Sequence, residues 1–414
     1  MELTTTQSNV FLNEWLQQIP TKVQHIPDEV LVDALKYIEE KGIPDLKNEA
    51  YRGVPIESIL KRYFKKIEIA SKSEVANTKV VFKNFIVVGD AYNALSIEKG
   101  IRVFTSADNI PQEYLNWIGH FKLHQKDFFA ALNTGYCDKL IIIHITETLD
   151  QPLHLIHFIS NQGNFNQQRV LVIVDEQVKA TVLESYHFTC QQSYFYNTLS
   201  EIIQKEHSQL HWINVQNNPT NTIYSINNVS FSLEKSAILK HHQISLKGSL
   251  WRNNIEVHIQ QPDVNTEMKG LSIGKNQSII SQYTSILHHS GHSHSHQLYK
   301  NIADDKSTVL FNGFILVDKN AQKTDAYQNS KNILLNDNAT LFARPQLEIY
   351  ADDVKCSHGS TTGSLNEDAL FYLKARGIEE KDAQRLLLQA FFNDVIEEID
   401  NANIREFVIQ QIEL

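Results

Sequence analysis

The chain has 414 residues, of which 42% are hydrophobic, and it carries a formal net charge of −10 at pH 7. That hydrophobic fraction is large enough for a substantial core and excludes an intrinsically disordered protein. The acidic balance, with no Lys/Arg-rich arm to offset it, argues against a nucleic-acid partner, which would need clustered basic residues.

Cysteine usage and apolar runs indicate the compartment. Cys137, Cys190 and Cys356 are too few and too scattered for a disulfide framework, so we expect a cytoplasmic protein, with Cys137 and Cys190 as buried small apolar residues. The first residues, MELTTTQSNVFLNEW, lack the basic and apolar regions of a signal peptide. The longest apolar runs, such as 140–143, are too short to cross a bilayer, so no membrane partner is expected.

Residues 1–77 are predicted to form an N-terminal helical region. A helix is expected over 28–41, ended by Gly42, and a second short helix over 55–64. The apolar stripe of the first helix consists of Val30, Leu31, Ala34, Leu35 and Ile38. This region reads as an ordinary helical cap.

Residues 78–360 are predicted to form a β-rich core. Short β-branched and aromatic runs occur at 80–88, 140–145, 170–174, 223–231, 271–273 and 309–317. Asparagine-rich turn signals lie between them, 111–132 looks helical, and 191–206 is ambiguous. So many strands with so few helices exclude a doubly wound α/β sheet. On this pattern alone a sandwich and a β-solenoid are about equally favoured.

Residues 361–414 are predicted to form a C-terminal helical domain. One helix begins near Glu367 and ends at Gly377, and another begins near Glu379. The apolar stripe of this second helix consists of Ala383, Leu386, Leu387, Ala390, Phe391, Val395 and Ile399. The stripe could pack within the helical hairpin or dock a partner. We expect the acidic residues Asp394, Glu397, Glu398 and Asp400 to form a solvated face.

The strongest chemical signal is the pair Cys356 and His358. They stand two apart after a run that reads as extended, so thiol and imidazole should share one face of a strand. Together they suit a thiophilic metal or an iron–sulfur unit. Two ligands cannot close a tetrahedral site, however. A half-buried thiol and a hydrogen-bonded imidazole with no ligand role therefore remain the alternative.

Three other motifs carry weaker signals. The histidine string is His288, His289, His292, His294 and His296. In an extended segment its last three members would share a face, but a solvated turn is the favoured interpretation. Residues 359–363 lack the lysine of a phosphate-binding loop and are expected to be a flexible strand-to-helix connector. Asp352 and Asp353 are adjacent, which is the wrong spacing for paired acid–base carboxylates.

The residues around these motifs are more specific than their spacing. ADDVKCSHGSTTG followed by LFYLKARGI, with HHSGHSHSHQLYKNI and AYQNSKNILL before them, strongly resembles the SufB/SufD family of iron–sulfur cluster assembly proteins. LEI and KCSHG follow the SufD pattern, and no cysteine lies between Gln328 and Asn338, where a SufB-type cysteine would be sought. The resemblance implies a mainly β protein: a right-handed parallel β-helix core flanked by N-terminal and C-terminal α-helical regions.

The resemblance also implies a function. The chain would be a non-enzymatic, SufD-like scaffold subunit that pairs with a SufB-like paralogue and docks a SufC-like ABC ATPase through its C-terminal helices. His358 would contribute a ligand to a transient iron–sulfur cluster at the subunit interface, with a supporting role for Cys356. A cysteine and a glutamate of the SufB-like chain would complete the site. ATP would bind only to the SufC-like partner, and the sequence does not decide whether a flavin joins.

Two alternatives are kept beside this interpretation. The first is a purely structural partner of the SufB-like subunit, with no ligating residue. The second is a β-helix carbohydrate-active enzyme, which is disfavoured because neither a secretion signal nor catalytic groups spread over neighbouring turns are visible. An open sheet edge could also pair with its own copy, so a homodimer is expected to be accessible to the isolated chain.

Overall fold

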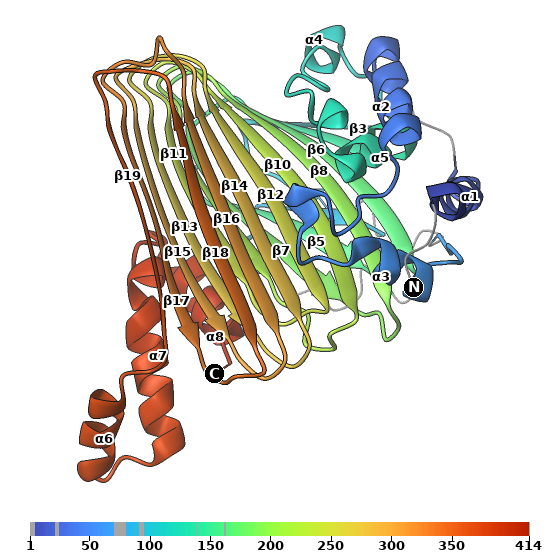
Figure 1. Ribbon diagram of the computed structural model, residues 1–414. Helices are drawn as coiled ribbons and strands as arrows, with labels where there is room; N and C mark the ends of the chain where they lie inside the picture. Colours follow the sequence, from blue (N-terminus) through green and yellow to red (C-terminus); the bar gives the residue numbers. More distant parts are fainter. Residues whose placement is uncertain are drawn as a thin grey trace.

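The structure is a computed structural model that describes residues 5–20, 25–69, 80–90, 95–137, 139–160 and 163–413. Two long sheets lie face to face and wind into one parallel β-helix (Figure 1). From β4 onward, successive strands along the chain alternate between the sheets, so a strand pairs with the one two positions further on. This arrangement decides between sandwich and solenoid in favour of the parallel β-helix with flanking helices that the resemblance implied.

The two sheets are named here by their strands. Sheet A contains, in order, β3 (Ile101–Thr105), β4 (Leu140–Ile145), β6 (Phe165–Val174), β8 (Tyr194–Gln204), β10 (Ile223–Leu233), β12 (Leu250–Ile259), β14 (Ile279–His288), β16 (Thr308–Val317) and β18 (Thr340–Ile349). Sheet B contains β2 (Leu95–Ser96), β1 (Phe85–Gly89), β5 (Leu153–Ile159), β7 (Lys179–Phe188), β9 (Gln209–Gln216), β11 (Ile238–Ser245), β13 (Asn265–Gly274), β15 (His294–Ala303), β17 (Asp325–Leu334) and β19 (Lys355–Gly363). Each predicted run overlaps one of these strands, and the ambiguous segment 191–206 contains β8.

The core consists of columns of inward side chains stacked from turn to turn. One column on sheet A is Val172, Ile202, Phe231, Val257, Ile286 and Ile315. All six are buried in the same apolar cluster. Strand side chains alternate between faces, so the parallel register places like residues over one another. Full burial of one such side chain is worth about 1.5–3 kcal/mol.

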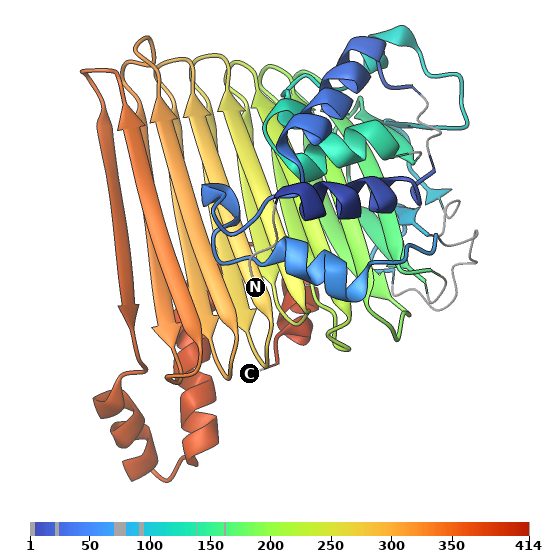
Figure 2. The ribbon, with the colours of Figure 1, turned by 45° about the vertical axis from the view of Figure 1, so that its right-hand side comes forward.

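The N-terminal helices and the insert between β3 and β4 cover the outer face of sheet A (Figure 2). These elements are α1 (Thr5–Leu16), α2 (Asp28–Lys41), η1 (Glu49–Tyr51), α3 (Ile56–Tyr63), α4 (Gln112–Leu115), η2 (Leu123–Gln125) and α5 (Phe128–Tyr136). Trp15 packs edge-on against Phe165, and Phe64 packs against Phe195. The predicted α2 and α3 are confirmed, whereas 111–132 holds only short helical pieces and the start of α5. The predicted boundary at residue 77 lies outside the described residues.

The C-terminal helices α6 (Glu367–Ala375), α7 (Glu380–Glu397) and α8 (Ala402–Gln411) lie on the opposite side of the molecule (Figure 1). α7 and α8 pack on the outer face of sheet B. The predicted stripe of α7 was partly wrong: Leu386 is 43% exposed, and the face that packs is completed by Leu388, Phe392 and Ile396. The sheet, rather than a partner helix, therefore decides which side of α7 is buried.

The acidic residues near the end of α7 are exposed, as predicted, and several of them pair with lysines of sheet B. Lys300 Nζ lies 2.7 Å from Asp394 Oδ1, and Lys240 Nζ lies 3.0 Å from Asp400 Oδ2. Glu398 pairs with Lys269. The carboxylates remain about half exposed or more, so each pair is worth at most about 1 kcal/mol.

Candidate functional site

The two ends of the β-helix are built differently. At the N-terminal end, β2 pairs with β1 and β3 pairs with β4 in antiparallel fashion, so the parallel stack stops there. At the C-terminal end, β18 and β19 each pair with a strand on one side, and within the described chain no strand follows them. A row of backbone donors and acceptors on an edge strand is a template for pairing with another chain. The C-terminal end is therefore an open end.

The Cys-x-His pair lies on β19, at the mouth of this open end. Cys356 is in register with Ala326 and His358 with Gln328, and both partners are buried inward-facing residues of β17. Register neighbours point to the same face, so Cys356 and His358 both face the interior, as the spacing of two predicted. Cys356 is half-buried against the apolar core, whereas His358 is exposed because no turn lies above it.

The Cys356 thiol is held in its protonated form near neutral pH. Burial raises its pKa, and the Asp325 carboxylate raises it further. A metal would have to displace this proton, because the thiolate is the form that ligates.

The residues flanking the pair correct one prediction and support another. Residues 359–363 are not a flexible connector but the second half of β19, paired with Asn329–Ile333 of β17. Asp352 and Asp353 lie exposed at the corner before β19, and Asp353 pairs with Lys323. Neither aspartate forms a carboxylate pair of the acid–base kind.

Comparison with known proteins identifies the family of this chain. The family model described as "SUF system FeS cluster assembly, SufBD core domain" matches residues 157–391, which is more than half of the chain and includes every strand from β6 to β19. The chain belongs to the SufB/SufD family.

Individual relatives agree with this assignment. The iron–sulfur cluster assembly protein SufD of Escherichia coli is 26% identical over 98% of this chain and 94% of its own length. An iron–sulfur cluster assembly SufBD family protein of Synechocystis sp. is 29% identical over 80% of this chain and 76% of its own length. SufD of Bacillus subtilis is 23% identical over 62% of this chain and 59% of its own length. The chain is thus a SufD-like member of a family that assembles iron–sulfur clusters.

The pair on β19 is an incomplete ligand set for a SufB/SufD protein acting alone. Across the described residues, no three His, Cys, Asp or Glu side chains are grouped so that they could hold a metal ion. A tetrahedral iron or zinc centre needs four ligands. Cys356 and His358 could therefore supply at most part of such a site.

The five residues of the histidine string lie in different environments and point in different directions. His288 is buried and inward-facing, with Nε2 2.9 Å from Ser295 Oγ, which corrects its assignment to a solvated turn. His289 Nδ1 lies 2.7 Å from Asp318 Oδ2. His292 is in a left-handed turn conformation (φ 58°), while His294 and His296 occupy the outer face of β15. The string therefore does not converge on one point.

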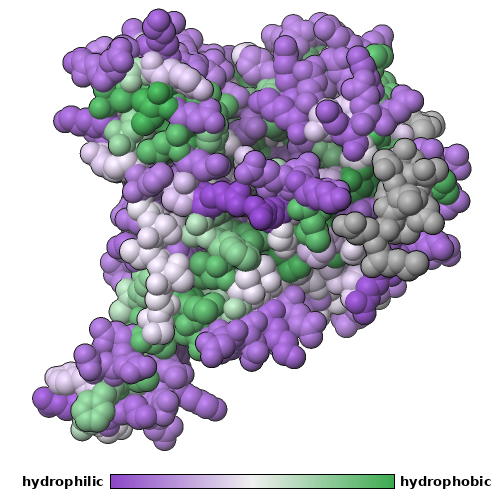
Figure 3. Space-filling model, viewed as in Figure 1, coloured by the Kyte–Doolittle hydropathy of each residue, from purple (hydrophilic) through white to green (hydrophobic). Residues whose placement is uncertain are grey.

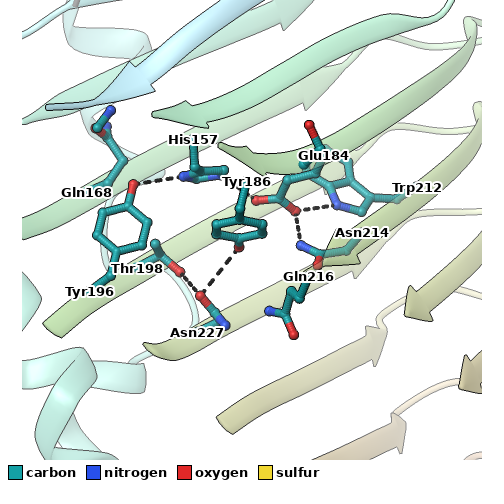
Figure 4. A network of polar contacts seen from close by, with 12 residues as sticks. His157, Gln168, Glu184, Tyr186, Tyr196, Thr198, Trp212, Asn214, Gln216 and Asn227 are labelled. Carbon is teal, nitrogen blue, oxygen red and sulfur yellow. Dashed lines mark hydrogen bonds and ion pairs between the residues drawn. The ribbon is translucent and has the colours of Figure 1, made fainter. Parts of the chain in front are cut away.

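The interior also holds a polar network that sequence reasoning missed (Figure 4). His157 on β5 lies 2.7 Å from Glu184 Oε1 through Nε2 and 2.8 Å from Tyr196 Oη through Nδ1. Trp212 Nε1 and Asn214 Nδ2 donate to Glu184 Oε2 over 2.8 and 2.6 Å. Burial alone would raise the pKa of Glu184, but its bonds to these partners, above all His157, hold it below the usual value. The network joins consecutive turns of the β-helix.

The helix α6 presents a second candidate surface. None of its residues is buried, and it projects beyond the ends of the strands (Figure 1). Phe371 is 73% exposed and Tyr372 is 58% exposed. Apolar residues are visible on this projecting unit in the space-filling view (Figure 3). Adjacent exposed aromatic side chains on a helix are typical of a protein interaction site.

Along the chain, no described helix combines the length and the apolar character that a membrane crossing requires.

Proposed function

We propose that this chain is the SufD-like, non-catalytic scaffold subunit of an iron–sulfur cluster assembly complex with a SufB-like paralogue and a SufC-like ABC ATPase. The observation that carries the proposal is the position of His358, inward-facing and exposed on a terminal strand that is paired on one side only. A side chain in that position can be completed by ligands from a chain that docks at the open end. The cluster is then transient cargo of the complex, shared across the interface.

Edge pairing supports the choice of a paralogue as the partner. β18 and β19 offer two adjacent edges of the same β-helix, so a partner built from the same kind of turns could continue both sheets. Continuation would also bury exposed apolar side chains of this end, which include Phe342, Ile349 and Tyr350. A second copy of this chain could occupy the same edges in isolation.

The exposed aromatics of α6 support docking of the ATPase. Phe371 and Tyr372 lie on a helix that contributes nothing to the core, while α7 and α8 anchor the unit to sheet B. Nucleotide would then be bound by the partner and not by this chain, whose 359–363 segment is a strand. The C-terminal helices follow β19 directly in the chain. A movement of the bound ATPase would therefore be transmitted through these helices to β19 at the open end.

Co-purification tests the assembly. Tagged protein isolated from its native cytosol should carry a longer SufB-like paralogue, an ABC ATPase, and substoichiometric iron and sulfide. Recovery of the chain alone, or of a homodimer alone, under gentle conditions would contradict the scaffold proposal.

His358→Ala should lower the iron and sulfide content of the reconstituted complex by about tenfold or more while leaving subunit recovery unchanged. The reason is that His358 is exposed on the terminal strand, so its loss removes a donor and little stability. Iron and acid-labile sulfide per complex are the measured quantities.

His296→Ala is the matched control, because His296 is an exposed histidine on the outer face of β15. It should leave cluster content unchanged. Equal cluster content in His358→Ala and the wild type would favour the purely structural alternative, in which no residue of this chain ligates.

Phe371→Ala should weaken binding of the ATPase subunit by about 30-fold, the effect of losing one aromatic anchor worth about 2 kcal/mol. Ile409→Ala serves as the control, since Ile409 on α8 is 54% exposed and lies on a different helix. Calorimetric titration of the full chain with the ATPase measures both affinities. An unchanged affinity for Phe371→Ala would remove α6 from the interface.

A further inference from the structure

A ladder of inward polar side chains leads to His358. Gln297 on β15, Gln328 on β17 and His358 on β19 are successive register partners. Gln297 is 3% exposed and Gln328 is 2% exposed, so both side chains lie inside the β-helix. Neighbouring strands are about 4.8 Å apart, which is within reach of two such side chains.

The two glutamines meet different residues across the interior. Gln297 Oε1 accepts a hydrogen bond from Thr284 Oγ1 over 2.8 Å. The register neighbour of Thr284 on the next strand is Gly313, which has no hydroxyl to offer. The amide of Gln328 occupies the space above Gly313, where a Cβ would lie only 1.6 Å from Nε2. The absence of a side chain at Gly313 therefore leaves space for the Gln328 amide. Gly313 offers no hydroxyl, however, so Gln328 lacks the hydrogen bond that Gln297 receives from Thr284.

The Gln328 amide is left unpaired by the described residues, at both Nε2 and Oε1. A buried amide without partners costs about 1–3 kcal/mol, so its persistence calls for an explanation. The inward register partner of Gln328 on the next strand, toward the open end, is His358. A histidine that ligates a metal usually donates its other ring N–H to a second side chain or carbonyl, which fixes the tautomer and the ring orientation.

We propose that Gln328 is the positioning residue of His358. Its Oε1 accepts the N–H of one ring nitrogen, which leaves the lone pair of the other nitrogen directed out of the mouth of the β-helix. This inference rests on the proposed ligand role of His358 and deepens it. Gly313 is needed for this arrangement, because a side chain at that position would occupy the space of the Gln328 amide.

The test reads the tautomer of His358 directly. In the full chain with ¹⁵N-labelled histidine, the His358 signals are assigned by their loss in His358→Ala. One neutral tautomer should dominate in the wild type. In Gln328→Met, which keeps the length of the side chain and removes its polar atoms, the ratio of the two tautomers should change to that of an unconstrained imidazole. Removing an unpaired amide should leave the thermal stability unchanged or raised, so this variant is expected to fold.

Gln297→Met is the matched control, because it makes the same change one turn deeper in the ladder. It should leave the tautomer of His358 as in the wild type. In the reconstituted complex Gln328→Met should also lower iron content by about 10-fold or more, with Gln297→Met again unchanged. A His358 tautomer that is identical in Gln328→Met and wild type would overturn the positioning role.

The two proposals fail in distinguishable ways. A tautomer fixed by Gln328 together with normal cluster content in His358→Ala would reject the ligand role and keep the positioning contact. Loss of cluster in His358→Ala with a tautomer indifferent to Gln328 would do the opposite.

Discussion

Glu184→Leu is expected to lower the free energy of unfolding by about 3 kcal/mol or more, because each buried donor left without its acceptor costs about 1–3 kcal/mol. The carboxylate is 2% exposed and accepts from His157, Trp212 and Asn214. Leucine would fill the volume and leave all three donors without an acceptor inside the β-helix. Urea unfolding, followed by fluorescence and by circular dichroism, measures the loss.

Two further variants sharpen this result. Glu184→Gln retains the shape and an acceptor oxygen, so its loss should be smaller than that of Glu184→Leu. A Glu184→Leu/His157→Phe double variant should be less destabilised than the sum of its single changes, because the two residues share one interaction. Glu176→Leu, at an exposed turn, is the control. A Glu184→Leu midpoint that matches this control would show that the network contributes little.

Acidification from about pH 6.5 to about pH 4 is expected to unfold the protein. Burial lowers the pKa of His154 and His288 to about 3, of His211 and His241 to about 4, and of His242 well below its usual value. A histidine in the unfolded chain has a pKa of about 6.5. Between about pH 6.5 and about pH 4 the unfolded chain therefore binds protons that the buried histidines of the folded chain do not bind. Stability is complete above the unfolded pKa and falls by about 1.4 kcal/mol per pH unit for each such histidine.

Urea midpoints at several pH values between 7.5 and 5 measure this slope. His211 and His242 are in contact beneath the C-terminal helices, with His211 Nε2 3.0 Å from His242 Nδ1. Asp400 and Lys240 also face His211, with opposite effects on its pKa. The His211→Gln/His242→Gln double variant should flatten the slope by about two histidines' worth, whatever it does to stability at pH 7.5. His294→Gln, on the surface, should not change the slope. A stability that is flat down to pH 5 would contradict the assignment of these histidines as neutral.

The features predicted correctly from sequence are those with a local cause. β4 and α2 follow their apolar runs, since an unbroken β-branched segment and a stripe at helical spacing each specify one structure. The shared face of Cys356 and His358 follows from the period of two in any strand. The features that were missed depend on residues far away in the chain.

Register is the common cause of the misses. Residues 359–363 are rich in glycine and threonine and form a strand because β17 is available to pair with them. Leu388 rather than Leu386 is buried because sheet B determines which side of α7 is packed. Nothing local marks Glu184 as inward-facing, or distinguishes Gln328 from Gln297. The difference between the two glutamines appears once Thr284 is placed opposite Gln297 and Gly313 opposite Gln328.

The unequal ends of the β-helix also limit how large an assembly can become. A stack that offered parallel edges at both ends could add subunits without limit and would form fibres. Here the N-terminal end finishes in short antiparallel strands, while β18 and β19 remain available. Two chains joined through their open ends would bury the only long edges either possesses among the described residues. Growth would then stop at a pair, and the size of the complex would be set by the fold of each subunit rather than by its concentration.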